Sequence, residues 1–135
     1  MGLFLDNIKR NPVLVTVVGK YSSVGKAGTG TYILKSSNGT DLVIPENAII
    51  YEIVVNVKTA VTSSGSATIS LGYEGANTAF LDAEAKTSFD ATTKIKDTAV
   101  AKVKLSSAKK ANITIGGAAL TAGALEVIIT YAVVV

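Results

Sequence analysis

The residue types that most often perform catalysis are scarce in this chain of 135 residues, which contains no histidine and no cysteine. Histidine is the usual general base near neutral pH, and the cysteine thiolate is a common nucleophile. Carboxylates, lysines and hydroxyls are the groups that remain for chemistry. We predict no catalytic residue, no cofactor-binding residue and no enzymatic activity.

Acidic residues gather in one stretch where they could offer oxygen ligands to calcium or an acid/base pair for cleaving a glycoside. The residues are Glu74, Asp82, Glu84 and Asp90, together with Asn77. They lack the dense alternation of acidic residues found in calcium loops. A sugar-cleaving groove is usually lined by tryptophan, and the chain has none. We therefore expect solvated loop carboxylates and predict no metal site.

Two basic features could bind phosphate groups. Residues 25–31 are rich in glycine, but Lys26 is followed by Ala27 and a predicted strand, whereas a P-loop continues with serine or threonine and opens a helix. The net charge is only +3, and no aromatic residue interleaves with the lysines of residues 94–110. We predict a solvated, edge-protecting lysine face and no nucleic-acid partner. These lysines are Lys94, Lys96, Lys102, Lys104, Lys109 and Lys110.

Two long stretches alternate between apolar and polar residues with the period of two that is typical of half-buried strands. In residues 49–61 the odd positions are predicted to face the core, and in residues 125–135 the odd positions do so again. The first set comprises Ile49, Tyr51, Ile53, Val55, Val57, Thr59 and Val61, and the second comprises Leu125, Val127, Ile129, Tyr131, Val133 and Val135.

The remaining chain predicts further short strands separated by turns rich in glycine, serine and asparagine. Residues 19–30 and 74–85 are predicted to be loops, the second with a helical turn at 78–83. We expect an all-β protein: a jelly-roll-like antiparallel β-sandwich of about eight to ten strands. It would form a single domain over residues 13–135, preceded by an N-terminal arm at residues 1–12. The further predicted strands lie at 13–18, 31–35, 41–44, 67–73, 101–105 and 111–115.

Composition points to a surface that meets partners. Charged residues make up 17% of the chain, below the usual quarter, while hydrophobic residues reach 48%. Such a surface favours a homo-oligomer. The arm is predicted to contact a neighbour through Leu3, Phe4, Leu5, Ile8 and Arg10. No signal peptide and no membrane span are expected, since the longest apolar run is short and contains Glu126.

The second half of the chain resembles a recurring pattern in virion proteins of tailed bacteriophages. An Ile-Pro-x-Asn-Ala turn leads into a long strand with a Thr-Ala ending, and a Leu-Thr-Ala-Gly turn precedes a final strand. The matching segments are residues 44–50, 59–61, 67–72, 77–81, 120–123 and 125–131. Residues 1–43 carry no such likeness.

The resemblance implies a small jelly-roll protein of the virion, assembled in the cytoplasm of the bacterial host. It would be a non-enzymatic capsid decoration (cement) protein. The partners that the resemblance implies are the major capsid protein or another virion protein, and the expected oligomer is a trimer. The alternatives are a tail or fibre accessory protein and a receptor- or carbohydrate-binding β-sandwich module. The latter needs exposed aromatic residues, and with Tyr51 and Tyr73 assigned to the core only Tyr21 is predicted to be free.

Overall fold

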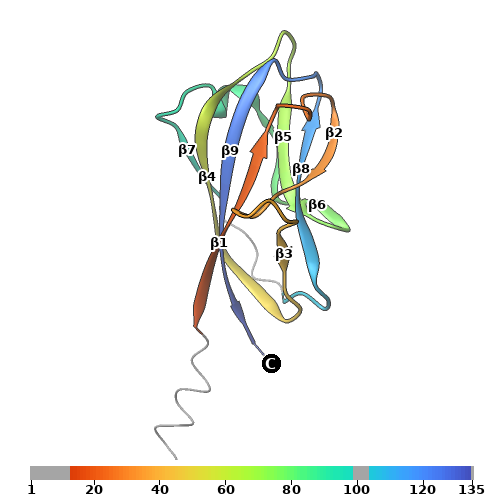
Figure 1. The fold of residues 1–135 in the computed structure, drawn as a ribbon, viewed down its shortest axis with the longest axis vertical. Helices are drawn as coiled ribbons and strands as arrows, with labels where there is room; N and C mark the ends of the chain where they lie inside the picture. Colours follow the sequence, from red (N-terminus) through yellow and green to blue (C-terminus); the bar gives the residue numbers. More distant parts are fainter. Residues whose placement is uncertain (1–12, 99–103, 135) are drawn as a thin grey trace, which may run out of the picture.

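Two antiparallel sheets face each other in the computed structural model, which describes residues 13–98 and 104–134 (Figure 1). The first sheet has the order β1-β9-β4-β7, and the second has the order β2-β8-β5-β6 with β3 also paired to β8. The strands are β1 (Leu14–Ser22), β2 (Gly30–Ile33), β3 (Val43–Ile44), β4 (Ala48–Thr62), β5 (Thr68–Tyr73), β6 (Ala76–Ala85), β7 (Ile95–Thr98), β8 (Lys109–Gly116) and β9 (Ala122–Val133). One 3₁₀ turn, η1 (Lys86–Phe89), follows β6.

The connections between the sheets make the sandwich a jelly roll. β2 and β3 pair with successive parts of β8 and together occupy one strand position beside it. Each sheet therefore has four strand positions, and β1-β9-β4-β7 faces β2/β3-β8-β5-β6. Between β2 and β3 the chain leaves the sheet in a short hairpin, in which Lys35 pairs with Asp41. The all-β sandwich predicted from the alternating pattern is confirmed.

The core lies between the four central strands, where inward side chains are β-branched or leucine. Ile53 of β4, Ile129 of β9, Leu71 of β5 and Ile113 of β8 are all completely buried. Each such side chain stabilises the fold by roughly 1.5–3 kcal/mol relative to an exposed position. With so few aromatic residues, the two faces are filled by side chains of similar length, which suits closely packed sheets.

The inward face of β4 differs from the predicted one at Tyr51 and Thr59, both of which are exposed. The pairing of β4 with β9 shifts between Ile50 and Glu52 and again between Val57 and Thr59. A bulge adds a residue on one strand and so changes the phase of the alternation. Ile50 therefore points into the core, and Tyr51 is 39% exposed.

Residues 74–85 form the hairpin strand β6 rather than the predicted loop with a helical turn at 78–83. The pairing of β5 with β6 shifts twice, so the polar and apolar residues of β6 do not alternate regularly. The resulting bulge lies over Gly72: a side chain there would come within 2.1 Å of the Ala76 carbonyl oxygen. Asn112 fixes the bulge by donating a hydrogen bond to the Asn77 side chain at 2.7 Å.

The other predicted strands are found, with changed limits. β1 continues through Gly19 to Ser22, where a loop was expected to begin. Gly19 is needed there because a Cβ would meet the Leu42 side chain at 2.8 Å. The predicted strand at 101–105 lies mostly outside the described residues; within them, Lys104 forms a bridge with Ile49.

Replacing Gly72 by alanine should lower the free energy of unfolding by about 2 kcal/mol or more, because the new methyl group collides with backbone that cannot move without breaking the β5–β6 hairpin. Gly28→Ala is the matched control: its nearest neighbour, the Tyr32 hydroxyl, is at 3.6 Å. That change should be neutral or slightly stabilising. Urea denaturation measures both, and equal stabilities of the two variants would contradict the packing at Gly72.

Candidate functional site

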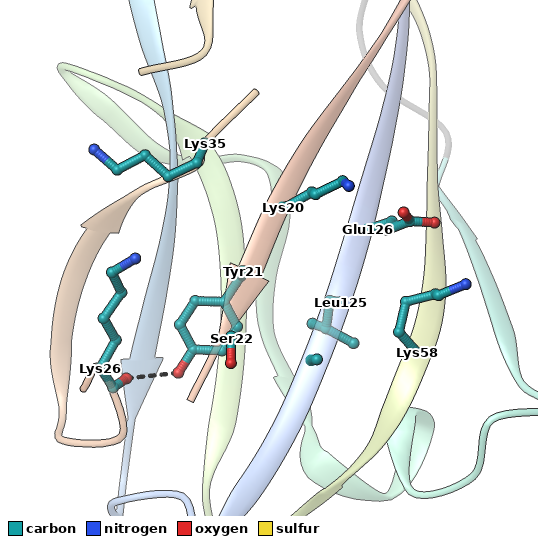
Figure 2. Close-up of a pocket in the computed structure, with 9 residues that line it drawn as sticks. Lys20, Tyr21, Ser22, Lys26, Lys35, Lys58, Leu125 and Glu126 are labelled. Carbon is teal, nitrogen blue, oxygen red and sulfur yellow. Dashed lines mark hydrogen bonds between the residues drawn. The ribbon is translucent and has the colours of Figure 1, made fainter. Parts of the chain in front are cut away.

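A cavity of about 360 Å³ lies where β1, the loop after it, β4 and β9 meet. Figure 2 shows Tyr21 at this site with its hydroxyl directed at the backbone of Lys26, to which it donates a hydrogen bond at 2.6 Å. The Tyr21 ring also lies 6.1 Å from the ring of Tyr32. Tyr21 is only 4% exposed. The prediction that Tyr21 is the free aromatic is therefore wrong, because β1 runs past Gly19 and turns this ring into the sandwich.

Burial raises the pKa of Tyr21 to about 12, with a further contribution from the neighbouring Tyr32. A tyrosine acting as a general base needs the opposite environment, one that favours the phenolate. The hydroxyl is committed to the Lys26 carbonyl and stays protonated at physiological pH. Tyr21 therefore ties the loop after β1 to the core.

Lysine ammonium groups surround this cavity, and carboxylates balance part of their charge. In Figure 2, Lys20 and Lys58 lie on either side of Glu126, the residue that faces Lys20 across the β1–β9 pair. Lys35 pairs with Asp41, which also contacts Lys110 at 3.1 Å. Hydrogen bonds from Lys35 and then Lys110 lower the pKa of Asp41. The arrangement can attract anions, but it places no activated nucleophile at the cavity.

Three of the four acidic residues predicted to be solvated, Glu74, Glu84 and Asp90, contact lysines or other polar groups. Glu84 contacts Lys96 at 3.0 Å and accepts a hydrogen bond from Ser88, and these two contacts lower its pKa. Asp90 pairs with Lys94. Glu74 accepts a hydrogen bond from the Lys110 amide at 2.8 Å. Within the described ranges, no group of three or more acidic residues could hold a metal ion.

The predicted lysine face is divided among these ion pairs. Lys94, Lys96 and Lys110 each contact a carboxylate. Lys102 lies outside the described residues. A continuous positive stripe that could follow a phosphate backbone therefore does not form from these three lysines.

The predicted partner-binding residues of the arm, Leu3, Phe4, Leu5, Ile8 and Arg10, lie outside the described residues. The first residues that follow them are unusually apolar and exposed: Val13 is 79%, Leu14 53% and Val15 39% exposed. They lie at the end of the first sheet, where the start of β1 runs beside the end of β9 (Figure 1). Sequence reasoning missed this surface, although seven residues without a charge (13–19) were a visible signal.

Among the residues that the structure describes, no helix is long and apolar enough to cross a membrane.

Comparisons with known proteins identify the architecture. No family model and no curated protein matches the sequence. The fold is similar to chains in the acidic stable capsid structure of Helicobacter pylori bacteriophage KHP30 and in the capsid asymmetric unit of cyanophage Pam1, each with a TM-score of 0.66 at 16% identity. These matches cover 90% and 91% of this chain, and 88% and 86% of the respective chains.

A third similar chain belongs to the capsid of Ralstonia phage GP4. Its TM-score is 0.55 at 14% identity, and the match covers 93% of this chain and 86% of that chain. The three phage chains share this fold. The likeness extends over nearly the whole sandwich, so it includes the jelly-roll connections as well as single hairpins.

Stability should fall as the pH rises from about 10 to 12. In this interval an unfolded tyrosine ionises while the folded Tyr21 keeps its proton, so the unfolded state binds fewer protons and gains stability. Tyr21→Phe should cost about 1 kcal/mol near pH 7 through the lost hydrogen bond and should flatten this alkaline decline.

Tyr32→Phe is the control, because it removes a similar hydroxyl-to-carbonyl hydrogen bond, to Gly28 at 2.7 Å. Thermal unfolding between pH 7 and 12 compares the variants. An alkaline decline in Tyr21→Phe that equals that of the native chain would contradict the role assigned to Tyr21.

Proposed function

We propose that this protein is a non-enzymatic structural component of a phage virion, and that it acts as a decoration protein that binds and stabilises the capsid shell. The observation that carries the proposal is the fold likeness to chains of three phage capsid structures over about nine-tenths of the sequence. The sequence motifs of the second half point in the same direction independently of the fold.

The described surface supports a cohesive role. The cavity at Tyr21 holds a tyrosine whose burial favours the neutral form, and its lining residue Lys35 is paired with Asp41. Elsewhere on the surface, Glu84 is paired with Lys96. What the surface offers is apolar area, at the exposed start of β1 above all. Each Å² of apolar surface removed from water contributes about 25 cal/mol. When the same contact is repeated over a symmetric shell, avidity makes the total binding stronger than the modest binding free energy of one contact would give.

We infer that the protein binds as a homo-oligomer, with a trimer as the expected form, and that the N-terminal arm contacts a neighbouring subunit. Low charge and the apolar arm support this view. A tail or fibre location uses the same kind of sandwich, so the position on the particle is the property to test.

Empty shells of the phage that encodes the chain, assembled without it, provide the test. The full chain should bind at a saturable number of sites and raise the temperature at which shells disassemble. At a free concentration 100 times the dissociation constant, the gain is about 2.7 kcal/mol per site. Binding is measured by sedimentation with shells, and disassembly by light scattering.

The same sedimentation and light-scattering measurements with an unrelated protein of equal charge and size control for non-specific adsorption. Failure to bind shells, together with binding to cell-surface polysaccharide of the host, would overturn the decoration role in favour of a receptor-binding module.

A further inference from the structure

The edges of the two sheets differ in how they are protected. An exposed strand edge presents unpaired N–H and C=O groups, and proteins normally shield it with short strands, bulges, charges or covering segments. β6 is bulged, β7 spans four residues and carries Lys96 and Asp97, and the hairpin at residues 35–41 interrupts the edge formed by β2 and β3. Of the edges that the structure describes, only the first half of β1 lacks such a device.

The direction of the backbone groups on β1 follows from one bridge. Lys20 donates its N–H to the Lys35 carbonyl at 2.7 Å and accepts from the Lys35 amide at 3.1 Å, so both of its groups point away from β9. β1 pairs with β9 without a register shift. Because backbone groups alternate sides along a strand, those of Leu14, Thr16 and Val18 also point away from β9. No described residue pairs with these six groups.

A groove of about 480 Å³ runs along this edge. Thr16, Val17 and Val18 line one side, and the turn at residues 36–38 lines the other, with Leu42 between the sheets. A folded sandwich could not approach the edge closely without displacing this turn. A single extended segment fits the space, because strands in a sheet lie only about 4.8 Å apart.

We propose that the edge of β1 from Leu14 to Val18 accepts an extended strand from the N-terminal arm of a second copy of this chain. The added strand would pair with the six free backbone groups, which is the β-augmentation mode of recognition. Leu3 and Leu5 fall on one face of an extended segment and would lie toward Val17 and Leu42 in the groove. The inference rests on the proposed oligomer and is independent of shell binding.

Length and residue types favour an arm from another copy. Twelve residues extend to about 40 Å, more than twice the roughly 17 Å of a five-residue edge. A return onto its own β1 would need a tight turn at Asn11 and Pro12. Such hairpin turns need a positive φ at the first or at both central residues, which Pro12 cannot adopt and which proline disfavours in the preceding Asn11.

This contact is head-to-tail, since the arm of one copy meets the edge of the next. Such contacts close into rings when the rotation between copies permits. A ring of three would give the predicted trimer and would leave no free β1 edge in the assembly.

Two full-length variants separate the halves of the contact. Thr16→Pro removes an N–H that faces the groove while leaving the β1–β9 hydrogen bonds intact, and it should weaken assembly by about tenfold or more. Thr16→Ala is its control, because it removes the same hydroxyl, which lies 3.3 Å from the Thr130 hydroxyl, and keeps the N–H.

The double change Leu3→Asp and Leu5→Asp blocks the arm. Its control, Lys9→Gln with Lys104→Gln, shifts the net charge by the same two units and leaves the predicted contact residue Arg10 in place; Lys104 is exposed and lies outside the groove.

The decisive experiment mixes the edge variant Thr16→Pro with the arm-blocked double variant and measures the mass by light scattering. At a concentration above the dissociation constant of the native contact and below those of the weakened contacts, each should be monomeric alone, since one half of its contact is impaired. The mixture should form a complex of twice the 13.8 kDa chain mass, because the intact arm of one variant finds the intact edge of the other. Circular dichroism and melting confirm that both variants are folded.

A monomeric native chain, or a mixture that stays monomeric while the native chain assembles, would overturn the inference. Loss of assembly in the glutamine control would overturn it as well, because the attraction would then lie in charge. Shell binding is measured separately, so a chain that assembles through arm and edge without binding shells would overturn the decoration role alone.

Discussion

The apolar contact between two sheet faces is the interaction on which the rest of this molecule depends. Ile53 and Ile129 on one face, and Leu71 and Ile113 on the other, are completely buried. No disulfide is available to support the fold, and aromatic residues make up only 6% of the chain. Aliphatic side chains of similar length therefore provide the stability, and the spacing of the sheets follows from their packing.

That constraint determines where the irregular features lie. The inner faces of β4 and β5 must present apolar residues, so departures from alternation are absorbed as bulges, at Ile50 and Glu52 in β4 and along β6. Gly72 and the Asn77–Asn112 hydrogen bond hold the second bulge against the outer face of its sheet. Each irregularity keeps the core intact and changes the surface instead.

The surface that results combines paired charges with one unshielded strand edge. Most of the described carboxylates that could have formed a ligand set are held by lysines or by backbone N–H groups, and burial keeps the Tyr21 hydroxyl neutral. Unshielded apolar area and unpaired backbone groups coincide at one place, the first half of β1. In a sandwich whose other described edges are protected, this coincidence is the observation on which the proposed arm contact rests.

Periodicity along the chain was sufficient to predict the all-β sandwich, the long strands β4 and β9 and the turns around them. An alternation of apolar and polar residues is local information, and the side chains at Ile53, Val55 and Val127 follow it. The burial of Tyr21, the exposure of Tyr51 and the strand at residues 76–85 could not be predicted in this way. A bulge depends on which strand lies opposite and in what register, and a residue near the end of a strand is buried only if another part of the chain covers it. These relations join residues that are distant in sequence, so only the tertiary structure decided them.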